Sequence, residues 1–239
     1  MVNGVIGIGA TIALLLLIGG LIGLADRARF SPQWLLVAAL LVAVNDALLT
    51  RFYGTMPNLL AGLDRNWQGK ALALAASLAI AALPFFGWRR IGLTLAQAPG
   101  SLKASLPVAA FYCAFFAALA LAFPDGPANG EEIAFQLTMP GLEEEIFYRG
   151  LLLFALDRAF AGRVRFLGVD WGWGAVLSCM LFGMTHAFGF SDGQFAFDPL
   201  YFALTALPSF IAVWLRLRTG SLLIPVILHN FGNAVSLMI

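Results

Sequence analysis

Four charged side chains stand within seven residues of a chain that is otherwise largely apolar: Glu143, Glu144, Glu145 and Arg149. An apolar run, residues 151–156, follows at once, so the charges are expected in the opening turns of an apolar helix. Ionisable groups cost about 2.5–3.5 kcal/mol each in the middle of a membrane-spanning helix, so they are usually paired or functional. Residues four apart share a helix face, so Arg149 is expected to neutralise Glu145 and leave Glu144 available for chemistry.

Both histidines of the chain also fall in apolar stretches. His186 follows Phe182 by four residues, so the phenyl ring is expected to hold the imidazole. His229 precedes Asn233 by four, which puts two polar side chains on one helix face. At about 1.5 Å per residue from the expected helix ends, these polar side chains and Glu144 lie at similar depths of about 12–20 Å. We therefore expect the four to meet.

A carboxylate, two imidazoles and an amide are suited to activating water and stabilising an oxyanion. Glu144 would act as the general base while His186 orients the water. His229 and Asn233 would donate hydrogen bonds to the tetrahedral oxyanion. Zinc is the alternative, since Glu144, His186 and His229 could bind it and leave one position open. The residue types alone leave both chemistries open.

The composition is that of an integral membrane protein. The 239 residues are 61% hydrophobic and 11% charged, and the mean hydropathy is +0.88. Soluble domains are nearer one half apolar and one quarter charged. The net charge of +1 gives no basis for binding nucleic acid. Cys113 and Cys179 lie in apolar runs and are expected to be small core residues.

The apolar stretches predict an all-α fold, a polytopic transmembrane bundle of about eight spans. We expect a single membrane domain over residues 1–239, with a motif-bearing catalytic core from about residue 130 to 239. Charged segments and Pro/Gly breakers separate the stretches. The expected spans are 4–25, 33–50, 71–88, 105–123, 139–156, 171–190, 199–215 and 221–239.

Smaller features refine this outline. Asn129 is expected to cap a short helix from Glu131. Pro140 and Gly141 should break or restart that helix. Asp46, in a polar pair near the end of the second span, is expected to be a helix-end or packing residue.

The distribution of basic residues supports eight spans. With both termini outside the cytoplasm, the loops after the first, third, fifth and seventh spans hold ten Lys and Arg residues. The opposite loops hold three: Arg51, Arg65 and Lys70. Cytoplasmic loops carry the basic excess, so this orientation is the expected one. Residues 51–70 are interpreted as a loop.

Three motifs together resemble those of the CPBP family, the CAAX prenyl proteases and bacteriocin-processing (Abi-type) proteases of membranes. They lie in separate spans, in the family's order, over roughly the last hundred residues. Each is weak alone, and their combination is specific. The motifs are Glu144-Glu145-x-x-x-Arg149, Phe182-x-x-x-His186 and His229-x-x-x-Asn233.

The resemblance implies an intramembrane endopeptidase with the roles given above, and supporting roles for Glu145, Arg149 and Phe182. It implies a peptide or membrane-protein substrate, the lipid bilayer as surroundings and a bacterial inner membrane as location. Because Asn233 suits an oxyanion donor better than a zinc ligand, we prefer a glutamate-type protease without a cofactor. A zinc-dependent form is the alternative. Glu143 lies outside the motifs and receives no role.

Two other classes of protein also place Glu and His inside a membrane. A transporter or proton relay would spread polar residues along a pathway or between repeated halves. Here they cluster in the fifth, sixth and eighth spans. A non-catalytic immunity protein would not need the motif residues, all of which are present.

Overall fold

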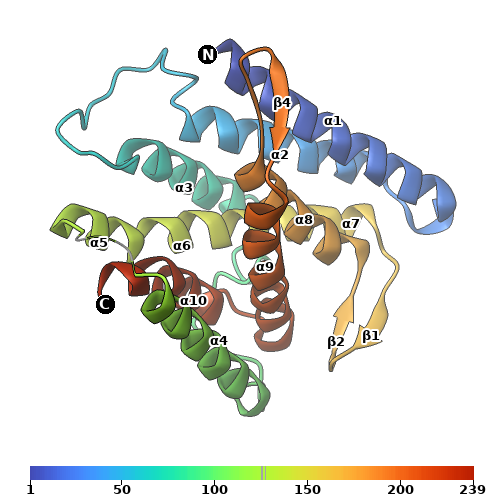
Figure 1. Cartoon of the computed structure of the whole chain (residues 1–239). Helices are drawn as coiled ribbons and strands as arrows, with labels where there is room; N and C mark the ends of the chain where they lie inside the picture. Colours follow the sequence, from blue (N-terminus) through green and yellow to red (C-terminus); the bar gives the residue numbers. More distant parts are fainter. Residues whose placement is uncertain (125, 127) are drawn as a thin grey trace.

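One helical run lies at the centre of the fold, and the other helices pack around it (Figure 1). The computed structural model describes residues 1–124, 126 and 128–239. The central run consists of α6 (Met139–Glu144), a π-helical segment (Glu145–Leu152) and α7 (Leu153–Ala159), which follow one another without a break. π-helical turns are rare and occur frequently at functional sites. The motif Glu144-Glu145-x-x-x-Arg149 crosses the junction between α6 and this π segment.

The remaining helices form two groups about the central run (Figure 1). On one side lie α1 (Val2–Ala25), α2 (Pro32–Leu49) and α3 (Trp67–Ala82). On the other lie α4 (Leu102–Ala122), α9 (Pro199–Thr219) and α10 (Leu223–Ala234). α8 (Trp173–Ala187) packs against both α7 and α9. The short helix α5 (Gly130–Gln136) leads into α6.

Short segments complete the structure. Two antiparallel hairpins occur, β1 (Val164–Phe166) with β2 (Val169–Trp171) and β3 (Phe188–Ser191) with β4 (Gln194–Phe197). Two 3₁₀ turns, Arg27–Arg29 and Val235–Leu237, follow α1 and α10. The predicted helical bundle is confirmed, with these hairpins as additions to it.

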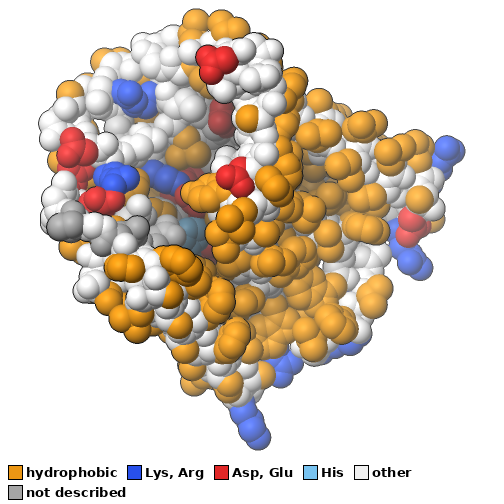
Figure 2. Space-filling model, viewed as in Figure 1, with side chains coloured by type: hydrophobic (Ala, Val, Ile, Leu, Met, Phe, Trp, Pro, Cys, Tyr) orange, Lys and Arg blue, Asp and Glu red, His pale blue; other side chains and the backbone are white. Residues whose placement is uncertain are grey.

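The surface of the bundle is apolar where a soluble protein would be polar. Large side chains such as Leu40 on α2, Phe111 on α4 and Leu207 on α9 are 63–66% exposed. Figure 2 shows apolar side chains covering the centre and right of one face, with basic side chains at its lower and right edges. An apolar surface of this extent is stable in lipid and not in water. The chain is an integral membrane protein.

Each expected span coincides with a helix or, for the fifth, with the central helical run. Within the described residues, four helices are long and apolar enough to cross a membrane: α1, α2, α4 and α9. α8 and α10 are apolar but shorter. The helix of the sixth expected span, α8, ends at Ala187 and not at the expected residue 190, because the chain turns into the β3–β4 hairpin.

The third helix corrects the interpretation of residues 51–70 as a loop. α3 begins at Trp67 because the Asn66 side chain caps it and accepts a hydrogen bond from Gly69 N (3.1 Å). Lys70 therefore lies in the first turn of a helix, and its side chain points into the bundle, where it is 12% exposed. It does not belong to the loop charges counted above.

Two local expectations are confirmed. Asn129 caps α5 by accepting a hydrogen bond from Glu132 N (2.8 Å). α6 carries Pro140 in its first turn. Gly141 then allows α6 to approach α10, since a Cβ at this position would lie 2.4 Å from Asn230 Oδ1. Gly141 N donates a hydrogen bond to the same oxygen (2.8 Å). This contact brings the opening of the central run against the helix that carries the second histidine.

Candidate active site

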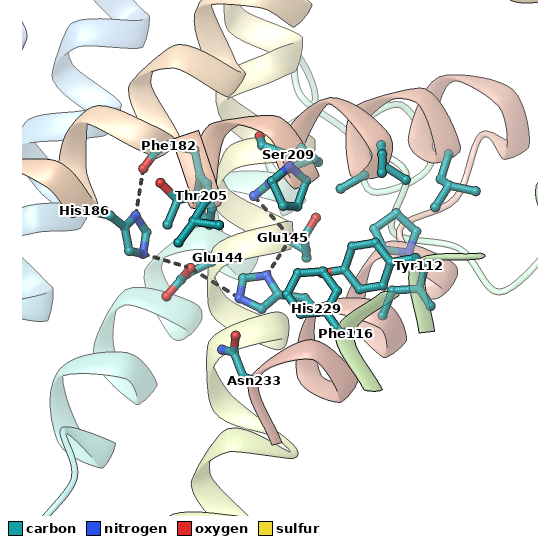
Figure 3. Close-up of a pocket in the computed structure, with 18 of the residues that line it drawn as sticks. Tyr112, Phe116, Glu144, Glu145, Phe182, His186, Thr205, Ser209, His229 and Asn233 are labelled. Atoms are coloured by element: carbon teal, nitrogen blue, oxygen red, sulfur yellow. Dashed lines mark hydrogen bonds and ion pairs between the residues drawn. The ribbon is translucent and has the colours of Figure 1, made fainter. Parts of the chain in front are cut away.

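All the side chains singled out from the three motifs line one cavity of about 280 Å³, which we call the main cavity. It lies between the central run and helices α4, α8, α9 and α10, and Figure 3 shows the side chains that face it. In the surface view, charged side chains gather around a hollow at the left of the face (Figure 2). The motif residues in the cavity wall are Glu144, Glu145, Arg149, Phe182, His186, His229 and Asn233.

Glu144 lies where the two histidines converge (Figure 3). Its Oε2 atom is 3.8 Å from His186 Nε2 and 3.6 Å from His229 Nε2. Asn233 lines the same cavity from the C-terminal part of α10. Glu144, His186, His229 and Asn233 thus line one cavity, whereas their common depth in the membrane stays a prediction.

His186 is held by the backbone as well as by the aromatic ring. Its imidazole lies 4.5 Å from the Phe182 ring, between centroids, as expected. In addition, His186 Nδ1 lies 2.7 Å from the carbonyl oxygen of Phe182. A carbonyl only accepts, so Nδ1 is the donor, and in the neutral ring the lone pair is on Nε2. That lone pair is directed toward Glu144.

The Glu145 carboxylate contacts two side chains, Arg149 and His229. Its Oε1 atom is 3.1 Å from Arg149 Nη1, which is the ion pair expected from the sequence. The same oxygen lies 2.7 Å from His229 Nδ1, a contact the sequence did not predict. The Arg149 guanidinium also lies over the Phe182 ring, 4.2 Å from its centroid. Glu145, Arg149 and Phe182 thus connect and support the two histidine-bearing helices.

Lys70 and Glu143 are the site residues that sequence reasoning missed. Lys70 Nζ lies 2.7 Å from Glu143 Oε2 and 2.5 Å from Glu144 Oε1, and Glu143 is fully buried. Glu143 lies outside the motifs, and the sequence predicts a loop at Lys70, so neither residue is expected at the site. A signal was present: three adjacent carboxylates in an apolar chain had only one predicted cationic partner, Arg149, so a second cation was required.

The side chains proposed as zinc ligands do not form a metal site. Among the described residues, no group of three or more His, Cys, Asp or Glu side chains is arranged to hold a metal ion. The Lys70 ammonium contacts Oε1 of Glu144, while both imidazoles face Oε2. A zinc ion at Oε2 would therefore share one carboxylate with a second cation, which would repel it. The donor set therefore does not fit zinc in this conformation.

Comparison with known proteins bears on the same part of the chain. Residues 131–235 match the family described as Rce1-like, the type II CAAX prenyl endopeptidases. In this region the chain is similar to that family. The match includes all three motifs and confirms the resemblance to the CAAX proteases. At the level of this family, the site is that of a membrane endopeptidase. No curated protein and no solved structure matches the chain.

Proposed function

We propose that the chain is an intramembrane endopeptidase that cleaves a peptide bond with a water molecule activated by Glu144 and His186. The observation that carries the proposal is the convergence of the Glu144 carboxylate and two imidazole Nε2 atoms within 3.6–3.8 Å, in the wall of one cavity. A general base must lie within reach of the proton it removes, directly or through one water, and these distances leave room for a bound water.

In this mechanism Glu144 removes a proton from the water, and His186 accepts a hydrogen bond from the same water at Nε2. The water oxygen forms a bond to the carbonyl carbon of the substrate. The resulting oxyanion receives hydrogen bonds from the Asn233 amide and from His229 Nε2–H. Because His229 Nδ1 faces the Glu145 carboxylate, Nε2 donates to the oxyanion when the ring carries both protons. The C–N bond then breaks, and the proton on Glu144 passes to the departing nitrogen.

The charged side chains around Glu144 do not balance when both imidazoles are neutral. Glu143, Glu144 and Glu145 carry three negative charges, and Lys70 and Arg149 carry two positive ones, so 2 − 3 leaves the group at −1. The third positive charge, on a doubly protonated His229 as the oxyanion step requires, makes the group neutral.

One part of the lining of the main cavity supports a substrate with an apolar group beside the scissile bond. This apolar part of a mixed wall includes Phe116, Leu204, Ile211, Leu215 and Leu228. The substrate we propose is a membrane-associated peptide or protein, and a prenylated C-terminal motif is the first candidate given the family. We also propose a bacterial inner membrane with both termini outside the cytoplasm, from the basic-residue asymmetry.

The test is cleavage of two quenched fluorescent peptides by the purified protein, one with a farnesylated cysteine four residues from its C-terminus and one without the lipid. Glu144→Gln, which keeps the shape of the side chain, serves as the blank. We expect cleavage by the wild type before and after treatment with a strong chelator, and none by Glu144→Gln. His186→Ala and His229→Ala should also lose activity while remaining folded.

The outcomes separate the alternatives. Activity lost on chelation and restored by zinc would contradict the metal-free mechanism and make Glu144, His186 and His229 ligands. Equal signals from wild type and Glu144→Gln on both peptides would contradict the protease.

A further inference from the structure

A second cavity, of about 170 Å³, lies on the opposite side of Glu144 from α4 and α9. Residues of α1, α2 and α3 form much of its wall. Its lining combines apolar side chains with several polar ones. The polar members are Asn45, Asp46, Lys70, Glu143, Tyr148, Thr185 and the two residues of the proposed water-activating pair.

Glu144 and His186 line both cavities. These two side chains therefore separate the main cavity from the second cavity. This arrangement allows the peptide bond and the water to approach the Glu144 carboxylate from different sides.

Two carboxylate oxygens of side chains that line the second cavity are buried and lack a partner. Glu143 Oε1 and Glu144 Oε2 accept no hydrogen bond from any described residue. Buried acceptors are normally satisfied by protein or by water. A cavity needs about 10–15 Å³ and two to four polar partners to hold one water, so the second cavity has the room and the groups for several.

A third cavity, of about 380 Å³, has one lining residue in common with the second cavity; we call it the outer cavity. Its lining includes the polar side chains of Arg51, Asp64, Arg65 and Gln68. Leu49 is the residue that lines both the outer and the second cavity. The side chain of Leu49 thus stands between the outer cavity and the cavity at Glu144.

We propose that the second cavity is a water-binding site, and that the hydrolytic water reaches Glu144 through it from the face formed by residues 50–66. This rests on the proposed protease function. It gives a role to the polar pair Asn45-Asp46, which no motif absorbs: these side chains provide hydrogen-bonding groups for water on α2. The substrate can then occupy the main cavity without blocking the supply of water.

The water content of the route is tested by thiol labelling, which does not depend on proteolysis. Val42→Cys in the second cavity and Leu49→Cys at the shared wall are made in a Cys113→Ala/Cys179→Ala background. Leu40→Cys, on the same helix with a 63% exposed apolar side chain, is the control that faces lipid. The thiolate is the reactive form and requires water, so a small cationic thiosulfonate should label Val42→Cys about tenfold faster or more than Leu40→Cys.

The route is tested by steric filling with the peptide assay above. Leu49→Trp should lower kcat about tenfold or more and leave KM unchanged, while Leu49→Ala and the control Leu40→Trp should retain wild-type kcat. Slow labelling at both cavity positions, or wild-type kcat in a folded Leu49→Trp protein, would overturn the water route. If the wild type cleaves neither peptide, the proposed function fails, and the labelling rates alone then decide whether the cavity holds water.

Discussion

Replacing Lys70 with methionine removes the ammonium group that contacts both Glu143 and Glu144 and nearly preserves the length of the side chain. The site charge then changes from −1 to −2, and two buried carboxylates lose their cation. Breaking a buried ion pair by removing one partner costs about 3–5 kcal/mol. Glu143 is fully buried and Lys70 only 12% exposed, so we expect a loss in this range for the free energy of unfolding.

A second substitution separates charge from packing. In Lys70→Met/Glu143→Gln the site charge returns to −1, and we expect recovery of about 1–3 kcal/mol, the usual coupling of contacting residues. The free energy of unfolding is measured by denaturant titration in detergent micelles. Lys103→Met, which alters the other lysine of the chain at an exposed position on α4, should lie within about 0.5 kcal/mol of wild type. A double variant no more stable than Lys70→Met would refute the electrostatic argument.

Three further predictions follow from contacts described above. Arg149→Leu leaves Glu145 buried without its cation and should lower the unfolding free energy by about 3–5 kcal/mol, with partial recovery when Glu145→Gln is added. Gly141→Ala forces α6 away from α10 and should cost about 1–3 kcal/mol and reduce peptide cleavage. The backbone N–H of Arg65 and of the residue before it donate to the exposed Glu131 carboxylate and hold its pKa below the ordinary value of 4.5. The contribution of the Glu131 carboxylate to the free energy of unfolding should therefore be complete above about pH 4.5 and disappear as the pH falls through the lowered pKa. The acid unfolding curves of wild type and Glu131→Gln should then converge.

The positions of the motif residues could be predicted because they depend on local geometry. The four-residue spacings from Glu145 to Arg149 and from Phe182 to His186 fix a shared helix face whatever the surroundings. Helix rise alone predicts that Glu144 and the histidines come close together. Long-range pairing does not follow from such rules. Lys70 and Glu143 are 73 residues apart, and only the packing of α3 on α6 brings them together.

The two hairpins were missed for a different reason. Residues 188–197 combine alternating aromatic residues with Asp192-Gly193 at the turn, a combination typical of β-hairpins. Both turn residues have the positive φ angles (52° and 80°) that such a turn requires. Hydropathy alone extended the sixth span into this segment, because aromatic residues count as apolar whichever structure they adopt. The sequence therefore carries the turn signal for β3–β4, and hydropathy alone does not detect it.

The β3–β4 hairpin links the second motif to the N-terminal helix. It begins two residues after His186, and Ala187 O accepts a hydrogen bond from Asp198 N (2.9 Å), which closes its base. At its side it rests on α1, where a Cβ at Gly7 would lie 3.6 Å from Phe190 N.

The support for His186 thus extends to α1, as the support for Glu144 extends to Lys70 on α3. Both helices precede the family-matched residues 131–235. The matched segment therefore does not contain all the helices that its own site requires. Moved into another membrane protein, it would carry every motif residue and lose the helices that hold two of them in place.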